Sequence, residues 1–406
     1  LIQNAEPGGG IYNLLFSYWS PKPDTIPTYA ASGEFSAVSW NAWKSAPGLD
    51  GLDGTFDLDQ DDGKVLLSGQ GMGVRIPNLF QQPLWIDSLY SELAWQLKEN
   101  GLWDISASNF ELQNEDIQLQ GEAVLQIDAE DAKPNLKLTT SFPKFQIEKA
   151  REYLPFKIMP EKTGKWLTRA LVAGQASDAS FSYDGPLSGA AFKDGSAVML
   201  ASFDVVNAEL DYKKDWPVIT GIAGKVAFKN ASMTLAADAA TVYDNQVKKA
   251  TAEIANFFRP ELKLDLDVEG ALTGALKYLR DIPVSRGMEG VMDAAETAGE
   301  VDLALKLDIP LSKKLNKKTS VDGRVDFNNN KLSFPENEIV VSNIKGVLDF
   351  TESSYTAENI SGNFRGSAVD IDVNTLKGKA VDIGVTGLFS VDQLLPGNTL
   401  LPEIAH

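Results

Sequence analysis

The 406-residue chain contains no cysteine, and its single histidine is His406, the last residue. Without thiols the chain cannot form disulfides, thiolate nucleophiles or zinc sites with sulfur ligands. One terminal histidine also leaves no basis for a Ser-His-Asp triad. The lack of cysteine is compatible with an oxidising compartment such as the periplasm, although many cytosolic proteins share it.

Long apolar runs are absent as well. No stretch approaches the roughly 18 continuous apolar residues that a membrane-spanning helix requires, and no cleavable signal sequence opens the chain. Because the chain begins at Leu1, we expect it to be an internal piece of a longer protein, with any anchor outside it. Its 37 basic and 56 acidic residues give a net charge of −19, which argues against nucleic acid as a partner.

What the chain does contain is a repeat with a period of about 120 residues, the signature of an array of similar units. The segment that starts at Tyr153-Leu154-Pro155 and runs to Pro186-Leu187 reappears from Tyr278-Leu279 to Pro310-Leu311. At 406 residues the chain also exceeds the size of one ordinary core. We therefore expect several units in series.

A second repeated element has the pattern apolar, any, Gly, any, apolar, any, apolar. It occurs at Leu52–Leu58, Ile222–Phe228 and Ile344–Phe350, in the same relative order as the first element. Each copy is typical of a strand that carries a glycine near its start. Three copies in the same order as the first element argue against a chance match.

Strict alternation of apolar and polar residues predicts β-strands with one apolar and one polar face. The pattern is clearest in Leu262–Val268, Val301–Ile309 and Val369–Val373, where aspartate and lysine occupy the intervening positions. Asp62-Gly63 and Asn100-Gly101 are hairpin turn signals. Links of this length leave no room for parallel crossovers, so the sheet is predicted to be antiparallel.

Two segments with helical spacing interrupt the strands, at 147–173 and at 272–298, each broken by proline and ended by a glycine. The predicted organisation is a first β repeat at 1–146, which opens with a loose lead-in or partial strand at 1–30, a second repeat at 147–271 and a third at 272–390. Residues 391–406 read as the truncated start of a further repeat. Alternation alone leaves two architectures open, a filled β-sandwich, which it favours, and one curved sheet with an apolar trough.

Few residues suggest chemistry. Asp57, Asp59 and Asp61 resemble a calcium loop, but the glycine and the final glutamate of such loops are misplaced, so a hairpin is the better interpretation. Gly69–Gly73 lacks the following helix of a phosphate-binding loop and indicates bulges or close packing. No carboxylate pair has an enzyme-like context, so we expect no catalytic residues, no metal site and no cofactor. A basic cluster, Lys313, Lys314, Lys317 and Lys318, is either a solvated loop or a docking patch for acidic groups.

Four segments carry a resemblance to a known family. They are Tyr153-Leu154-Pro155-Phe156-Lys157-Ile158-Met159 with the strand that follows, Asp215-Trp216-Pro217-Val218-Ile219, Leu305–Leu311 and Val391–Pro396. Together they resemble the YhdP family of AsmA-like proteins over most of residues 145–396, and more diffusely over the first third of the chain.

The resemblance implies an elongated, mostly β protein in which a curved antiparallel sheet, shaped like a taco, holds an apolar groove. It implies a periplasmic segment of a protein anchored in the inner membrane of a Gram-negative bacterium, which carries phospholipids between the inner and outer membranes. The membranes would be reached through parts of the protein outside this chain, and other envelope proteins are conceivable partners. The helical insertions would cover or gate the groove.

The inward aliphatic rows would then contact acyl chains. The expected groove-lining residues are Ile117, Leu119, Leu125, Ile127, Leu262, Leu264, Leu266, Val268, Leu303, Leu305, Leu307, Ile309, Val325, Phe327, Val369, Ile371 and Val373.

The alternative is a non-catalytic periplasmic scaffold that binds a protein or a polysaccharide. Polysaccharide sites expose stacked tryptophan and tyrosine rings, and five tryptophans fall in the first third of the chain: Trp40, Trp43, Trp85, Trp95 and Trp103. Core packing is the favoured explanation for them. The last two thirds, poor in tryptophan and rich in Leu, Val and Ile, favour lipid.

Overall fold

The computed structural model describes residues 5–20, 27–43, 47–128, 134–188, 194–281, 294–375 and 381–390. The chain divides into two compact units. Unit 1 comprises Leu1–Ala208 and Lys225–Ala231, and unit 2 comprises Glu209–Gly224 and Ser232–His406. Within the described ranges no helix is both long enough and apolar enough to cross a bilayer.

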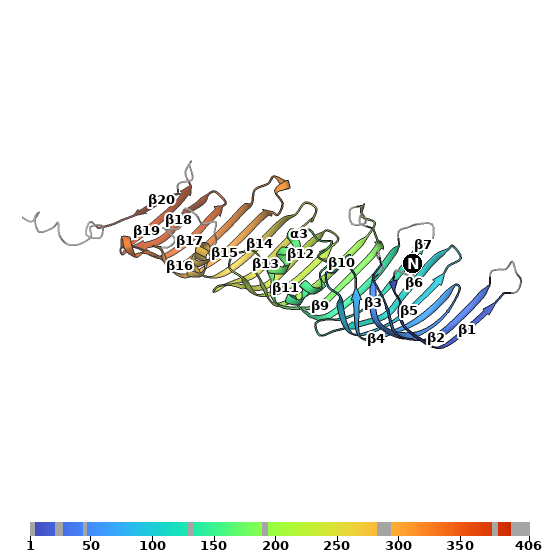
Figure 1. Cartoon of the computed structure of the whole chain (residues 1–406). Helices are drawn as coiled ribbons and strands as arrows, with labels where there is room; N and C mark the ends of the chain where they lie inside the picture. Colours follow the sequence, from blue (N-terminus) through green and yellow to red (C-terminus); the bar gives the residue numbers. More distant parts are fainter. Residues whose placement is uncertain are drawn as a thin grey trace, which may run out of the picture. The chain divides into compact units, whose positions relative to one another are not determined.

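Unit 1 is built from antiparallel strands that follow one another in chain order (Figure 1). Each strand from β1 to β9 hydrogen-bonds with the next, as the hairpin-length links predict. The strands are β1 (Gly8–Trp19), β2 (Thr28–Trp40), β3 (Gly48–Asp59), β4 (Asp62–Arg75), β5 (Leu84–Leu97), β6 (Leu102–Gln113), β7 (Gln118–Asp128), β8 (Asn135–Gln146) and β9 (Leu171–Pro186). Three short helices separate β8 from β9: η1 (Ile147–Lys149), α2 (Ala150–Tyr153) and α3 (Glu161–Ala170).

Unit 2 repeats this plan. Consecutive strands from β12 to β20 pair antiparallel. They are β12 (Ser232–Val242), β13 (Asn245–Ile254), β14 (Glu261–Ala271), β15 (Glu296–Pro310), β16 (Ser320–Phe334), β17 (Ile339–Thr351), β18 (Tyr355–Phe364), β19 (Ser367–Thr375) and β20 (Val381–Gly387). Helix α5 (Leu272–Asp281) follows β14, and η2 (Lys313–Leu315) and η3 (Pro335–Asn337) occupy later turns. Strands β10 (Val198–Leu210) and β11 (Ile219–Lys229) contribute residues to both units.

The mostly β, antiparallel fold class is confirmed, and the preference for a filled sandwich is wrong. In each unit the described strands form one layer in which each strand lies beside its chain neighbours. Alternation fixes which residues share a face, but it does not say whether a second sheet covers that face.

The second repeated element occupies equivalent places. Leu52 lies in β3, Ile222 in β11 and Ile344 in β17, and all three side chains are buried. The element therefore marks a recurring strand whose first apolar residue packs into the core. The repeat boundaries at 146, 271 and 390 remain predictions, and the expected start of a further repeat at 391–406 lies outside the described residues.

Of residues 1–30, predicted as a loose lead-in or partial strand, Gly8–Trp19 forms strand β1, which pairs with β2. A bulge explains why the alternation is hard to see. The register shifts between Tyr12 and Leu15, where Asn13 has a positive φ of 49°, so the residues on either side of the bulge follow different phases.

The helical insertion at 147–173 ends earlier than predicted. Helix α3 stops at Ala170, and Leu171 already belongs to β9. Gly174 is therefore not a helix cap. It lies within β9 at φ +118°, where a Cβ atom would come within 2.5 Å of the Ala208 backbone. Of the insertion at 272–298, α5 covers Leu272–Asp281, β15 begins at Glu296, and most residues between them lie outside the described ranges.

The glycine-rich and aspartate-rich segments have structural roles. Gly69–Gly73 lies inside β4, and the register shifts opposite it, between Asp50 and Leu52, which confirms a bulge. In the β3–β4 turn the Asp59 carboxylate accepts hydrogen bonds from the backbone N–H groups of Asp61 and Asp62, at 2.8 and 2.9 Å. These bonds lower the pKa of Asp59 and confirm the hairpin interpretation.

Candidate functional site

In unit 2 the apolar side chains form rows that cross the strands without interruption. One row consists of Ala240, Val247, Val268, Leu303, Val325 and Leu348, each taken from the next strand between β12 and β17. Directly paired residues of antiparallel strands lie on the same face. Six strands at about 4.8 Å spacing make this row roughly 24 Å long. We call this side of the sheet the apolar face.

A second row lies beside the first, two residues away along β14, β15, β16 and β17. Ala250 pairs with Leu266, Leu266 with Leu305, and Leu305 with Gly323, which pairs in turn with Phe350. The Phe350 ring lies over Gly323, since an added Cβ would come within 2.1 Å of its Cζ atom. Aliphatic and aromatic groups therefore fill this row, and no polar side chain enters it.

The other side of the same strands is charged, and we call it the polar face. Lys263 pairs with Asp308, and Asp265 with Lys306, whose side-chain N and O atoms are 4.0 Å apart. Arg324 contacts Asp349 at 3.4 Å. These groups are exposed, so the ion pairs contribute little stability, but they give the sheet a solvated side.

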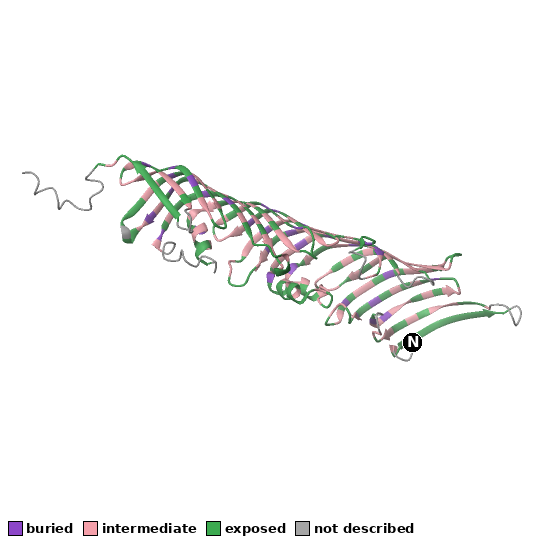
Figure 2. Cartoon of the chain, turned by 90° about the horizontal axis from the view of Figure 1, so that it is seen from above, coloured by how far each residue is buried: buried purple, intermediate pink, exposed green. Residues whose placement is uncertain are grey.

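The apolar face is neither a filled core nor an open surface. Figure 2 shows that exposed residues and residues of intermediate burial alternate along the strands, with few that are buried. In unit 2 one buried cluster contains Ile344, Ala357 and Ile360, and Phe327 and Ile371 pack against it. Most of the larger aliphatic side chains elsewhere on this face retain partial solvent access, whereas Val301 and Val369 are buried.

All seventeen predicted lining residues are in the described part of the chain. Val369 is buried at 3% exposure, and the other sixteen are half-buried. Thirteen belong to β14, β15, β16 and β19 of unit 2, and Leu119, Leu125 and Ile127 belong to β7 of unit 1. Ile117 precedes β7 and forms an isolated bridge with Phe145. Whether any of them contacts a ligand stays a prediction.

Unit 1 has an apolar face with more aromatic residues. Leu125 pairs with Ile105 and Ile105 with Trp95, whose ring lies over Gly63 in β4. A Cβ at Gly63 would come within 2.3 Å of that ring, so any larger residue here would have to displace the indole. Leu52, Met72 and Ile86 form a buried cluster on this unit.

The tryptophans do not form one stacked platform. Trp40 donates from its indole nitrogen to the Pro47 carbonyl at 2.7 Å, and Trp95 covers Gly63. Trp43 and Trp103 are half-buried. Trp85 is 64% exposed, although the next residue, Ile86, is buried. Core packing therefore accounts for Trp40 and Trp95. Trp85, which is exposed, still fits the alternative of a polysaccharide-binding surface.

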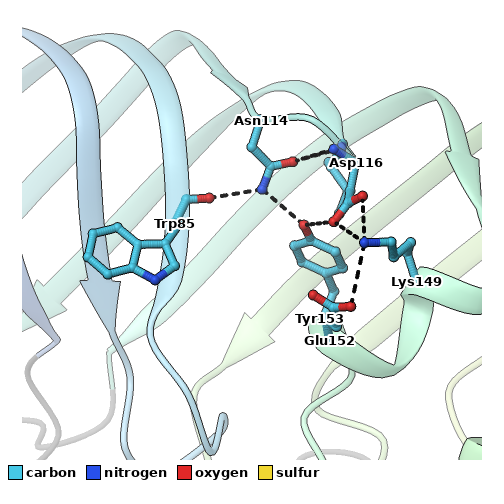
Figure 3. Close-up of polar contacts among 7 residues, drawn as sticks. Trp85, Asn114, Asp116, Lys149, Glu152 and Tyr153 are labelled. Carbon is cyan, nitrogen blue, oxygen red and sulfur yellow. Dashed lines mark hydrogen bonds and ion pairs between the residues drawn. The ribbon is translucent and has the colours of Figure 1, made fainter.

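The helices of unit 1 form a segment at one edge of the sheet, residues 147–170, which we call the helical strap. Figure 3 shows how it is attached to the turn between β6 and β7. Tyr153 donates its hydroxyl to Asp116 at 3.1 Å and accepts a hydrogen bond from Asn114 at 2.9 Å. Lys149 lies 3.2 Å from Asp116, whose side chain is only 12% exposed. The Asn114 amide also donates to the Trp85 carbonyl at 2.9 Å.

A second attachment lies further along the strap. Lys157 donates its backbone N–H to the Leu79 carbonyl and its ammonium group to the Pro77 carbonyl, at 3.5 and 2.6 Å. Both carbonyls belong to the connection between β4 and β5. The strap therefore runs past the ends of several strands, and the two attachments join sequence positions up to 80 residues apart.

Unit 2 has a counterpart in α5. Tyr278, which the repeat aligns with Tyr153, shares a hydrogen bond with the Tyr212 hydroxyl at 2.8 Å, and the Trp216 ring packs edge-on against both tyrosines. Tyr243 donates to Asp281 at the end of the helix. Burial raises the pKa of Tyr278 and of Tyr212. In both units a tyrosine anchors the helical insertion to an earlier turn.

The Tyr153 anchor gives a testable titration. Burial, reinforced by the hydrogen bond to Asp116, raises the pKa of Tyr153 to about 12. Because the folded pKa exceeds that of a free tyrosine, the stabilisation is complete below pH ~10 and is lost as the pH rises towards about 12. Tyr153→Phe should remove one late-ionising phenol from an absorbance titration. Tyr12→Phe, at an exposed position, is the control, and an unchanged late phase in Tyr153→Phe would contradict the assignment.

No arrangement for metal binding is apparent within the described ranges. These contain no group of three or more histidine, cysteine, aspartate or glutamate side chains that could hold a metal ion. Sequence reasoning missed the Asn114, Asp116 and Tyr153 contacts, because the partners are up to 39 residues apart. The repeat of Tyr153 at Tyr278 was the one available signal.

Comparison with known proteins agrees with this geometry. The sequence model of the family described as YhdP protein matches residues 1–404. A relative from Escherichia coli (strain K12), named "Intermembrane phospholipid transporter YhdP", is 22% identical over 389 residues. The match covers 94% of this chain and 30% of the relative, so the chain spans less than a third of that protein's length. No solved structure matches.

Proposed function

The chain belongs to the YhdP family. From this membership, and from an apolar face whose side chains are only half-buried, we propose that the chain carries phospholipid acyl chains in transit between two membranes. The E. coli relative is named as an intermembrane phospholipid transporter. The role proposed for this chain is non-catalytic.

The observation that carries the proposal is the uninterrupted aliphatic row on unit 2. From Val247 through Val268 and Leu303 to Val325, each strand supplies an apolar side chain that is only half-buried. A structural core would bury such residues fully, and a solvated sheet would not repeat them on every strand. Partial exposure of a continuous apolar row is what a surface for acyl chains requires.

The row also supports movement. Each methylene group removed from water contributes about 0.8 kcal/mol, and successive strands offer nearly the same contact. An acyl chain would therefore find similar free energies at neighbouring positions along the row, without a deep well to hold it. The charged polar face would meanwhile keep the other side of the sheet in water.

The finer parts of the proposal concern the whole protein. We place this chain in the periplasm, as a segment of a protein anchored in the inner membrane that delivers phospholipid towards the outer membrane. In this proposal the seventeen predicted residues, which are Ile117 and sixteen residues of β7, β14, β15, β16 and β19, line a groove, and the helical insertions at its edge cover or gate it. Other envelope proteins would act at its ends.

The test is to purify the chain from a Gram-negative host without harsh detergent, and to identify bound lipid by native mass spectrometry and by extraction. We expect phospholipid to co-purify. A lipid-free chain that also rejects added fluorescent phospholipid would reject the proposal. Binding of a polysaccharide that is lost in Trp85→Ala would instead favour the scaffold alternative.

A further inference from the structure

Helix α3 presents an exposed face on which basic residues surround a tryptophan. Lys162, Lys165, Trp166 and Arg169 occupy positions i, i+3, i+4 and i+7, so they lie on the same side of the helix. All four are exposed, and Trp166 retains 41% of its accessible surface. The opposite side carries Leu167, which is half-buried, and Ala170, which is fully buried. The helix therefore packs through one side and offers the other to solvent.

This face departs from the charge of the rest of the protein. Residues 147–170 contain six basic and three acidic side chains, whereas the whole chain has a net charge of −19. Lys165 contacts Glu161, but both side chains are more than three-quarters exposed, so an anion could displace this contact at little cost. A local excess of positive charge on an acidic protein points to an anionic ligand.

The position of α3 relates it to the apolar face of unit 1. The strap leaves β8 at Ile147 and enters β9 after Ala170, and both residues are buried. Strand β9 then contributes Ala179 and Tyr183 to the buried residues of this unit. Helix α3 thus continues directly into β9, so its cationic side chains lie just beyond the end of a strand that carries apolar residues of this unit.

We propose that Lys162, Lys165, Trp166 and Arg169 form a binding site for the phosphate head group of an anionic phospholipid. The inference rests on the proposed function, since the acyl chains of that lipid would lie on the apolar face of unit 1. Ammonium and guanidinium groups donate to phosphate oxygens, and tryptophan favours the boundary between an apolar phase and water. The site would select lipids by charge, which the aliphatic rows cannot do.

The test compares lipids with different head groups. The purified chain is stripped of lipid, incubated with an equimolar mixture of phosphatidylglycerol and phosphatidylcholine, and separated from vesicles. Extracted lipid is then quantified. We expect the wild-type chain to favour phosphatidylglycerol, and Lys162→Gln/Lys165→Gln to reduce that preference about fivefold without lowering the total lipid. The control is Lys263→Gln/Lys306→Gln on the polar face of unit 2. Both variants remove two positive charges, and circular dichroism verifies that each folds.

The outcomes separate the two claims. If wild type and both variants carry lipid with equal head-group composition, the head-group site is wrong and the transport proposal stands. If no chain carries either lipid, the transport proposal fails and the site fails with it. Loss of preference in the control as well would assign the selectivity to overall charge and overturn the site. Inorganic phosphate that abolishes the preference, while total lipid is retained, would support a site that recognises the phosphate itself.

Discussion

Leu264→Asp/Leu305→Asp should remove most of the phospholipid that co-purifies with this chain. Leu264 pairs with Leu307 and Leu305 with Leu266, so the two carboxylates would enter adjacent rows of the apolar face. An acyl chain cannot solvate a carboxylate, and the penalty of contact is several kcal/mol. Since about 1.4 kcal/mol corresponds to a tenfold change in affinity, we expect bound lipid to fall at least tenfold. Ile371→Asp tests the same effect on β19.

The matched control is Ala304→Asp. Ala304 is the neighbour of Leu305 in β15, but it is exposed on the polar face, between Asp267 and Arg324 of the adjacent strands. The same new carboxylate there should leave the lipid content unchanged. Lipid measured by extraction, with circular dichroism to verify folding, distinguishes the two faces. Equal lipid in both variants would mean that the apolar face of unit 2 does not hold the acyl chains.

Asn330→Leu should destabilise unit 2 by about 3 kcal/mol, because it leaves buried backbone groups without partners. Asn330 is fully buried. Its amide nitrogen donates to the Glu300 carbonyl at 3.0 Å, and its oxygen accepts the backbone N–H of Asn328 at 2.8 Å. These bonds span the bulge at Gly299, which has φ +97° and leaves no room for a Cβ atom beside Asn330. Leucine has a similar size but can make neither bond.

Urea unfolding measures this effect. Asn328→Ala provides the control, because the Asn328 side chain is exposed and its backbone N–H remains available to Asn330. We expect a lower unfolding midpoint for Asn330→Leu and a nearly unchanged midpoint for the control. Equal midpoints in all three proteins would show that the bulge does not depend on the buried amide.

The sequence predicted most of the regular strands because their pairing is local. In β14 and β15, aspartate and lysine alternate with leucine so strictly that a shift of one residue would expose every leucine. It also identified the helical insertions, through proline and helical spacing. It left β1 undecided between a loose lead-in and a partial strand, because the bulge at Asn13 changes the phase of the alternation. It failed at Gly174, which is typical of a helix end but lies within β9.

The candidate sites divide in the same way. The residues of the apolar face could be predicted, because the alternation within each strand shows which side chains lie on the same side of the sheet. The attachment of Tyr153 to Asn114 and Asp116 could not, because it joins an insertion to a turn that precedes two intervening strands. The helical spacing of Lys162, Trp166 and Arg169 in the sequence is enough to place them on one side of α3. Its position at the edge of the sheet depends on the path of the strap.

By itself, then, the sequence determined the strand faces, the antiparallel order and the family resemblance, since these depend on residues close together in the chain. Only the tertiary structure decided that the strands of each unit form one layer whose apolar side chains stay half-exposed. Alternation shows which side chains avoid water, but the same pattern occurs in a strand of a filled core and in a strand of an open apolar face. What covers the face depends on contacts between distant segments, which no local period encodes.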